Sequence, residues 1–195
     1  MADIRSFVAI ELSEELRAAL ASVQQQLRPQ VPPRTVRWTA PESIHLTLQF
    51  LGDVAPAAVA PITDALRGVC ANRPAFDLAL EGLGVFPNPR RPRIVWVGIV
   101  EASGALNALQ QAVGQALAPL GYPPEERPFT PHLTIGRVAR ELDLPELARL
   151  GEVITRSTTG RLGGMWVDHL NLMKSDLRPS GAIYTAQAVL PLLAK

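Results

Sequence analysis

The sequence predicts an α+β protein with two related lobes, each built on an antiparallel sheet that is covered on its outer side by helices. Short apolar segments typical of strands alternate with longer segments in which apolar residues recur at helical spacing, roughly in the order β-α-β-α-β-β-α-β-α-β-β. A β-α-β pattern that ends in the phrase His-Leu-Thr occurs once in each half, at His45 and at His132. This repetition indicates that the two halves have the same architecture.

Length and composition set the class of protein. A chain of 195 residues is long enough for one large domain or for two small lobes with a shared core. Its hydrophobic content of 47% and mean hydropathy of +0.12 predict a folded globule. The net charge of +1 excludes a protein that coats nucleic acid through its phosphates, so an RNA ligand would have to be held at a local site.

The N-terminal residues and the cysteine content indicate a cytoplasmic protein. Asp3, Arg5 and Glu11 interrupt the N-terminal segment, which therefore does not have the pattern of a signal peptide. No apolar run approaches the roughly 20 residues that cross a bilayer, so no membrane association is expected. Cys70 is the single cysteine and excludes an intrachain disulfide; it is predicted to be a buried thiol. Nothing in the chain demands a dimer, and a monomer is expected.

The first predicted elements follow from apolar segments and capping residues. Ser6–Glu11 is a short apolar strand bounded by charge. Ser13 is a typical N-cap, followed by two glutamates in the first turn, so a helix is expected from there to about Leu27, before Pro29. After a connector rich in proline and arginine, strands are predicted at Val36–Trp38 and Ile44–Leu51.

The central elements are a helix and two strands. Pro56–Val69 has apolar residues on one helical face and is predicted to be a helix. Phe76–Leu83 and Ile94–Val100 are predicted strands. The segment between them contains three prolines and three arginines, which leave it little chance of regular structure.

The last third of the chain continues the alternation. Ser103 opens a helix that runs from Leu106 to about Leu120 and is closed by Gly121. A proline-rich loop, YPPEERPFTP, precedes the second motif. The remaining predicted elements are a strand at His132–Val138, a helix at Leu144–Ile154, and strands at Trp166–Met173 and Ala182–Leu190.

The repeated phrase places the same groups on one face of each motif strand. Because side chains alternate along a strand, His45 and Thr47 share one face, and the leucines beside them share the other. The same holds for His132 and Thr134. Each strand thus presents an imidazole and a hydroxyl about 7 Å apart. One such pair has little meaning alone, whereas two pairs that use two of only three histidines predict a paired active site.

Two imidazoles and two hydroxyls suit phosphodiester chemistry. One imidazole can remove a proton from water while the other protonates the departing oxygen, and an imidazole pKa near 6.5 makes both forms available near neutral pH. The threonine hydroxyls can donate hydrogen bonds to non-bridging phosphate oxygens, where charge develops in the transition state. This chemistry requires no metal ion.

With these motifs, the chain resembles the 2H phosphoesterase superfamily. The phrases His45–Leu48 and His132–Ile135 match its two His-x-Thr-x motifs, and their flanks, RWTAPESIHLTLQFLGDV, RPFTPHLTIGR and LNLMKSDLRPSGAIY, resemble the bacterial RNA 2′,3′-cyclic phosphodiesterases, also called 2′-5′ RNA ligases. The similarity covers nearly the whole chain. It implies one bilobal domain over residues 1–195, with pseudo-two-fold symmetry, two antiparallel sheets and outer helices around a central groove, and one motif in each lobe.

The resemblance also implies an activity and roles for the four motif residues. The reaction would be hydrolysis of an RNA 2′,3′-cyclic phosphate end to a 2′-phosphate without a metal or cofactor, and its reversal would ligate RNA through a 2′-5′ bond. His45 would be the proton donor to the leaving 3′ oxygen, and His132 the base that activates water. Thr47 and Thr134 would hold the phosphate. The residues alone do not decide which histidine donates the proton.

Several further residues are candidate RNA-binding groups, each with an alternative. Arg137 would face away from Thr134 in a regular strand, although Gly136 is a residue type that marks bulges; it is either a phosphate or ribose ligand or a surface ion pair. Phe129 either stacks on a base or packs in the core. The remaining candidates form the densest basic cluster, which either guides RNA to the site or is a solvated loop: Arg90, Arg91 and Arg93.

Other conspicuous side chains are predicted to be structural. Trp38 and Trp96 lie in predicted strands and are expected to pack in the core. His169 lacks a threonine two positions later, so a structural or exposed histidine is expected. Tyr184 could border the groove, but no physical argument from the sequence places it there.

Other function classes stay open from the sequence. A metallohydrolase is poorly supported, because three histidines without a clustered ligand spacing offer few ligands. A non-catalytic module that binds RNA ends or nucleotides would keep the site and lack turnover. A third alternative keeps the chemistry but changes the substrate to a small cyclic phosphate or a 2′-5′ linked oligonucleotide.

Overall fold

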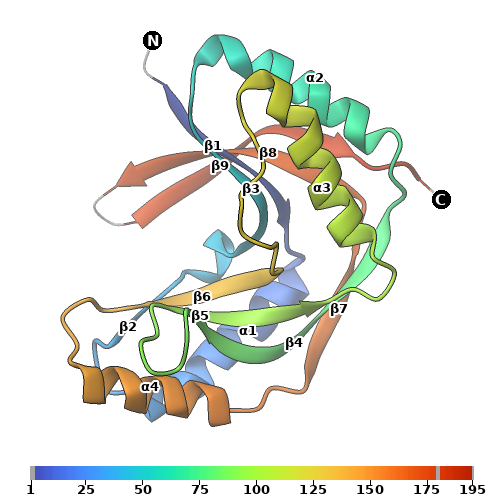
Figure 1. The fold of residues 1–195 in the computed structure, drawn as a ribbon. Helices are drawn as coiled ribbons and strands as arrows, with labels where there is room; N and C mark the ends of the chain where they lie inside the picture. The colour runs from blue at the N-terminus through green and yellow to red at the C-terminus, as the bar shows by residue number, and fades with distance from the viewer. Residues whose placement is uncertain (1–2, 179–180, 195) are drawn as a thin grey trace.

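The computed structural model describes residues 3–178 and 181–194, and Figure 1 shows its two lobes. All strand pairs within its two sheets are antiparallel, which confirms the predicted fold class. The four-stranded sheet has the order β3 (His45–Val54), β1 (Ile4–Glu11), β8 (His169–Arg178) and β9 (Gly181–Pro191). The five-stranded sheet has the order β2 (Val36–Trp38), β6 (His132–Val138), β5 (Ile94–Val100), β4 (Phe76–Phe86) and β7 (Arg161–Val167).

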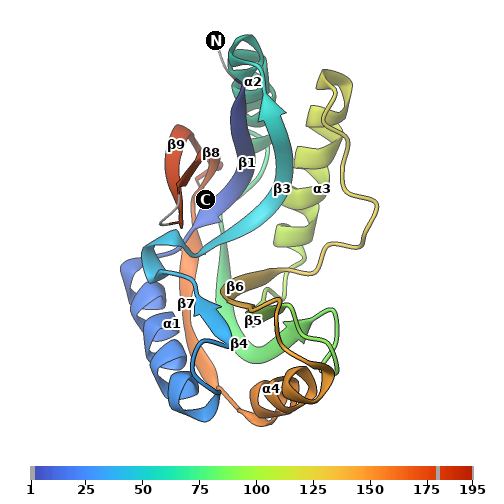
Figure 2. The same ribbon diagram turned by 90° about the vertical axis from the view of Figure 1, so that its left-hand side faces the viewer.

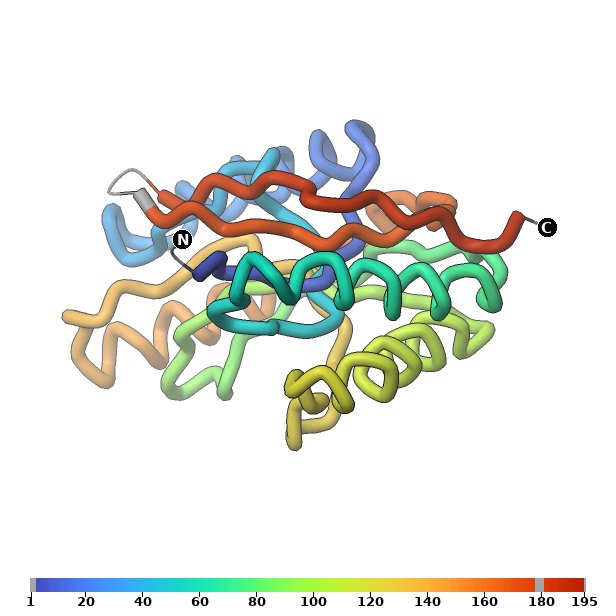
Figure 3. The backbone as a smooth tube through the Cα atoms, turned by 90° about the horizontal axis from the view of Figure 1, so that it is seen from above, coloured from blue at the N-terminus to red at the C-terminus, as the bar shows by residue number. Residues whose placement is uncertain are grey.

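Two α-helices cover each sheet. In the views of Figures 1 and 3, α2 (Val59–Cys70) and α3 (Ala105–Leu117) lie against the four-stranded sheet, where they contact its strands and each other. The other two, α1 (Glu14–Leu27) and α4 (Leu144–Arg156), lie against the five-stranded sheet. The buried leucines, valines and isoleucines of these helices join those of both sheets in one continuous core.

The lobes do not correspond to the two halves of the sequence. Strand β2 lies between two strands of the four-stranded sheet in sequence, yet it pairs with β6 in the other sheet. Strands β8 and β9 come from the end of the chain and complete the sheet that begins with β1. Each lobe therefore depends on segments that are distant in sequence, and neither can form from one half alone.

The predicted single strand Trp166–Met173 is wrong, because the chain changes sheets within it. Val167, at the end of β7, pairs with Phe76 in the five-stranded sheet, whereas His169, at the start of β8, pairs with Pro191 in the four-stranded sheet. At the break, the carbonyl oxygen of Asp168 accepts a hydrogen bond from the backbone N–H of Leu192, at 2.7 Å. An apolar run indicates that a segment is buried, but it does not indicate which strand the segment pairs with.

The helix ends largely follow the predicted capping residues. The Ser13 hydroxyl accepts from the N–H of Leu16, and α1 begins at Glu14, as predicted. The third helix begins at Ala105 with Gly104 as its N-cap, so Ser103 lies just outside it; a 3₁₀ turn then leads to Gly121 in the left-handed region, which ends the helix as predicted. The end of α2 buries Cys70, where loss of solvation raises the pKa of the thiol to about 11.

Two helical glycines should respond in opposite ways to alanine. A Cβ on Gly68 of α2 would meet nothing within 4 Å, so Gly68→Ala should raise the free energy of unfolding by about 0.5–1 kcal/mol. A Cβ on Gly151 of α4 would lie 1.9 Å from the carbonyl oxygen of Pro89, so Gly151→Ala should lower it by about 1–3 kcal/mol. Urea denaturation measures the free energy of unfolding of both variants. A stabilised Gly151→Ala protein would show that the loop before β5 does not pack on α4.

Candidate active site

The two motif strands, β3 and β6, are in contact although they belong to different sheets. His45 and Thr47 lie on β3, and His132 and Thr134 lie on β6. Figure 2 shows β3 passing above β6, and residues of the two strands approach one another. The leucine after each histidine is buried in the core, whereas the histidines and threonines are only partly buried. The alternation predicted for both strands is therefore confirmed, and the fold brings the two motifs together.

Both imidazoles are held in the same way by their own backbone. The Nδ1 atom of His45 lies 3.0 Å from the carbonyl oxygen of Ser43, and Nδ1 of His132 lies 2.7 Å from that of Thr130. A carbonyl oxygen can only accept a hydrogen bond, so Nδ1 carries the hydrogen in each ring. In the neutral state each Nε2 is then an unprotonated acceptor, ready to take a proton.

A one-residue bulge follows the threonine in both motif strands. On β3 the pairing with β1 passes from Thr47 to Gln49 and skips Leu48; on β6 the pairing with β5 passes from Thr134 to Gly136 and skips Ile135. A bulge reverses the alternation of faces beyond it. The third residue after each threonine therefore lies on the same face as the histidine and the threonine.

These third residues are Phe50 and Arg137. In a regular strand Arg137 would face away from Thr134, and that expectation is wrong. The bulge beside Gly136 places Arg137 on the same face of the sheet as His132 and Thr134. Among the residues that the structure describes, no carboxylate forms an ion pair with Arg137, which removes the alternative of a surface ion pair. Phe50, which is 58% exposed, was not expected at the site. The signal for it in the sequence is the equal spacing of Thr47–Phe50 and Thr134–Arg137.

Aromatic rings enclose His45. The Phe7 ring, on the neighbouring strand β1, stacks on the imidazole with ring centroids 4.7 Å apart. Tyr184 of β9 presents an edge-to-face contact at 4.8 Å, and Phe50 lies 6.1 Å from Phe7. Phe7 and Tyr184 reach the site only because β1, β8 and β9 join β3 in one sheet. Nothing in the sequence pointed to Phe7, and nothing there gave a physical reason to place Tyr184 at the site.

His132 has a similar aromatic neighbour on the other sheet. Phe86 of β4 makes an edge-to-face contact with the imidazole at 4.9 Å and packs on Trp96 at 5.3 Å. Trp96 lies directly opposite Thr134 in the sheet, and the absence of a side chain on Gly84 makes room for the indole ring. The prediction that Trp96 packs in the core is therefore wrong. For Trp38 the same prediction is confirmed.

The surroundings of His45 change its protonation. Burial lowers the pKa of the imidazole from 6.5 to about 4. The hydrogen bond to the Ser43 carbonyl opposes this change, and the positive charges of Arg137 and Arg17 lower the pKa further. Arg17, on α1, also donates to Glu11, which lies opposite His45 on β1. In the free protein, His45 is therefore neutral at pH 7.

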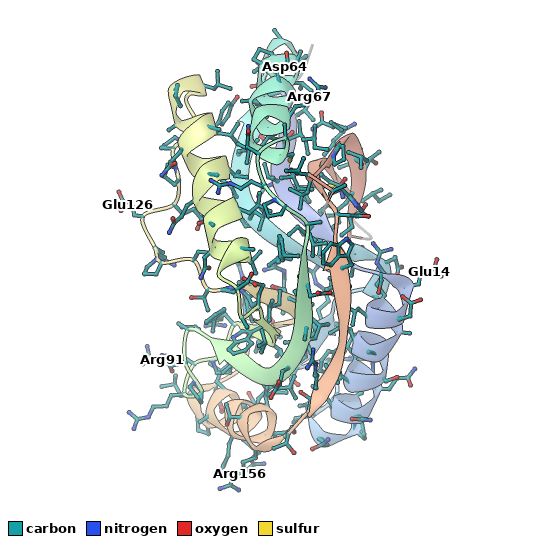
Figure 4. The ribbon with its side chains drawn as sticks, turned by 90° about the vertical axis from the view of Figure 1, so that its right-hand side faces the viewer. Glu14, Asp64, Arg67, Arg91, Glu126 and Arg156 are labelled. Atoms are coloured by element: carbon teal, nitrogen blue, oxygen red, sulfur yellow. The ribbon has the colours of Figure 1, made fainter. Side chains whose placement is uncertain are left out.

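Within the described residues, the side chains of the remaining sequence candidates form no hydrogen bond or ring contact with a motif histidine or threonine. Phe129 is partly buried against the core, which favours the packing alternative. Arg90, Arg91 and Arg93 are exposed on the loop before β5, which packs on α4, and Figure 4 shows Arg91 projecting outward beside that helix. The Arg93 guanidinium donates to the carbonyl oxygen of Ala139 at 3.4 Å. His169 is bonded to Asp168 at 2.5 Å and takes no part in the motifs, as predicted.

Cavities elsewhere in the protein do not include the motifs. One of about 280 Å³ lies between α1 and the segment 156–159, and one of about 230 Å³ lies beside the start of α3. Neither contains a motif residue. Within residues 3–178 and 181–194, no three His, Cys, Asp or Glu side chains are grouped as metal ligands, and no helix has the length and apolar character needed to cross a membrane.

Sequence comparison shows the same duplication as the motif strands. A family profile described as LigT like Phosphoesterase matches residues 10–96 and again residues 97–184, and each match contains one His-x-Thr motif. The chain belongs to the LigT-like phosphoesterase family. A protein of Methanothermobacter thermautotrophicus named RNA 2′,3′-cyclic phosphodiesterase is 35% identical to this LigT-like protein over 97% of this chain and 99% of its own. A protein of the same name from Archaeoglobus fulgidus is 34% identical over 93% of this chain and 96% of its own.

Solved structures have the fold of this LigT-like phosphoesterase. TT0787 of Thermus thermophilus superposes with a TM-score of 0.79 at 29% identity, covering 96% of this chain and 97% of its own. Escherichia coli LigT complexed with 3′-AMP superposes with a TM-score of 0.75 at 26% identity, covering 97% and 98%. The bilobal 2H phosphoesterase fold implied by the resemblance is thereby confirmed.

Proposed function

We propose that this LigT-like phosphoesterase hydrolyses RNA 2′,3′-cyclic phosphate ends to 2′-phosphates. The observation that carries the proposal is the pair of His-x-Thr strands in contact, in which each imidazole donates its Nδ1 hydrogen to a backbone carbonyl and leaves Nε2 as the working atom. The names of the curated relatives support the substrate class. We infer also that residues 1–195 act as one bilobal unit, because each sheet supplies one motif.

In the proposed reaction, the two histidines move protons on opposite sides of the phosphorus. His132 takes a proton from water through Nε2, and the water oxygen forms a bond to phosphorus. The bond from phosphorus to the 3′ oxygen breaks, and His45 gives a proton to that oxygen. The Thr47 and Thr134 hydroxyls donate to the non-bridging oxygens as negative charge develops there. When a 5′-hydroxyl replaces water in the same step, a 2′-5′ linkage forms.

The assignment of His45 as proton donor requires that substrate binding changes its protonation. The free imidazole has a pKa of about 4 and holds no proton at pH 7. A phosphate anion placed beside Thr47 favours the charged imidazolium and raises this pKa. The Ser43 carbonyl already acts in that direction. The donor role is therefore proposed for the complex with substrate, in which the anion also offsets the charges of Arg137 and Arg17.

Identification of the product isomer tests the reaction. Purified protein with excess EDTA is incubated with a nucleoside 2′,3′-cyclic phosphate and, separately, with a short RNA ending in one, and the products are separated by chromatography. We expect the 2′-phosphate from both, with no loss of rate in EDTA. A nucleoside 3′,5′-cyclic phosphate is the control and should be unchanged, since its phosphate bridges the 3′ and 5′ oxygens in a six-membered ring and not the vicinal 2′ and 3′ oxygens.

Each other outcome contradicts a stated part of the proposal. A 3′-phosphate product would reverse which oxygen leaves. Loss of activity in EDTA would contradict the metal-independent chemistry. If the RNA binds but neither substrate turns over, the protein is a non-catalytic module that binds RNA ends. If only a 2′-5′ linked dinucleotide is cleaved, the substrate class is 2′-5′ linked oligonucleotides.

A further inference from the structure

Two arginines lie directly opposite each other on adjacent strands at one end of the five-stranded sheet. In the antiparallel pairing of β2 with β6, Arg37 is opposite Arg137. Strand β2 is the edge strand, so nothing lies beyond Arg37 in the sheet. Both side chains are exposed. No local pattern in the sequence points to Arg37, because only the register of β2 with β6 brings it beside Arg137.

Both arginines lie on the face of the sheet that carries His132 and Thr134. Arg137 pairs with Ile94 on its other side, and Ile94 is two residues from Trp96, which pairs with Thr134. Residues opposite each other in a sheet share a face, as do residues two apart on one strand. Val36 and Trp38, on either side of Arg37, pack in the core or against it, which leaves Arg37 on the opposite face, with the site.

Within the described residues, no ion pair neutralises the charge of either arginine. Like charges directly opposite each other in a sheet are destabilising. In the described part of the chain, neither Arg37 nor Arg137 forms an ion pair or a side-chain hydrogen bond. By contrast, Arg17, the other arginine that acts electrostatically on His45, is paired with Glu11. Two unpaired arginines beside a phosphodiesterase site are suited to bind an anionic group of the substrate.

We propose that Arg37, together with Arg137, binds a backbone phosphate of the RNA next to the reacting cyclic phosphate. Arg137 is three residues beyond Thr134, about 10 Å along the strand, and Arg37 lies one strand farther out. Arg37 is therefore displaced from the reacting phosphate toward the rest of the RNA chain. Guanidinium groups match phosphate oxygens with paired hydrogen bonds. The inference rests on the proposed function and makes it more specific, because this pair selects RNA ends over mononucleotides.

The test compares two substrates in the variants Arg37→Gln and Arg37→Lys. A short RNA ending in a 2′,3′-cyclic phosphate has the second phosphate, and a nucleoside 2′,3′-cyclic phosphate lacks it. For Arg37→Gln we expect kcat/KM on the RNA to fall about tenfold, mainly through KM, and kcat/KM on the nucleoside to change less than twofold. Arg37→Lys keeps the charge without the paired hydrogen bonds and should restore part of the loss.

Salt dependence and a matched variant separate a direct contact from a general charge effect. Loss of one phosphate contact should reduce the slope of log KM for RNA against log salt by about 0.7 in Arg37→Gln. Arg91→Gln removes the same charge from the exposed loop on α4 and should leave the ratio of the two substrates unchanged. Each of three results would overturn the proposal. The first is an equal loss of kcat/KM on both substrates in Arg37→Gln, and the second is an unchanged salt slope in that variant. The third is the same change in the ratio of the two kcat/KM values in Arg91→Gln.

Binding keeps this inference distinct from the proposed function. If the wild-type protein turns over neither substrate, the proposed function fails. Fluorescence anisotropy with a short labelled RNA ending in a 2′-phosphate then tests the arginine pair alone, with a nucleoside 2′-phosphate as unlabelled competitor. Weaker binding of the RNA, but not of the nucleotide, to Arg37→Gln would support the inference. Unchanged RNA binding would overturn it.

Discussion

Replacement of either motif histidine by glutamine should lower kcat on a nucleoside 2′,3′-cyclic phosphate by about 10²–10⁴-fold, the range for loss of a general acid or base. Glutamine can still accept and donate hydrogen bonds, but it cannot transfer a proton at neutral pH. His45→Gln and His132→Gln should both retain the wild-type far-ultraviolet circular dichroism spectrum and a cooperative unfolding transition. Steady-state rates at pH 7 measure the effect.

The third histidine provides the matched control. His169→Gln changes an exposed side chain that bonds to Asp168, and it should leave kcat within about twofold of wild type. The double variant of His45 and His132 should be little slower than the slower single variant, since groups that act in one step are non-additive. Normal activity in either single variant, in a folded protein, would contradict the two-histidine mechanism.

Acid should remove about 3 kcal/mol of stability through His45 alone as the pH falls from 6.5 to 4. The folded-state pKa of about 4 is below the ordinary value of 6.5, which applies to the unfolded chain. Between these values the unfolded chain binds a proton that the folded protein does not. The contribution is thus fully present above pH 6.5 and is lost as the pH falls through 4.

Comparison with His45→Gln isolates this contribution from every other titrating group. Urea denaturation at half-unit steps from pH 7 to 4 gives the free energy of unfolding of both proteins. The difference between them should change with a slope approaching 1.4 kcal/mol per pH unit within this window. Saturating inorganic phosphate should weaken the slope if the anion raises the pKa of His45. Parallel pH profiles for the two proteins would show that the imidazole titrates normally.

The chemistry of the site could be predicted from the sequence because it depends on local spacing. The alternation along a strand places His45 with Thr47, and His132 with Thr134, whatever the rest of the fold does. Capping residues and apolar periodicity likewise indicated the first helix and most strands, since these signals act within a few residues. The repeated motif and its flanks were sufficient to indicate the family.

The tertiary structure decided what depends on partners distant in sequence. The pairing of β1 with β3 sets Phe7 against His45, and the switch of sheets at Asp168 brings β9 and Tyr184 to the same imidazole. Burial, which depends on this tertiary packing, is the main reason that the pKa of His45 is low. The bulges after the threonines turn Arg137 and Phe50 toward the site, and the register of β2 sets Arg37 beside Arg137. Strand pairing is set by the best joint burial of whole sheets, and no local run of residues contains that information.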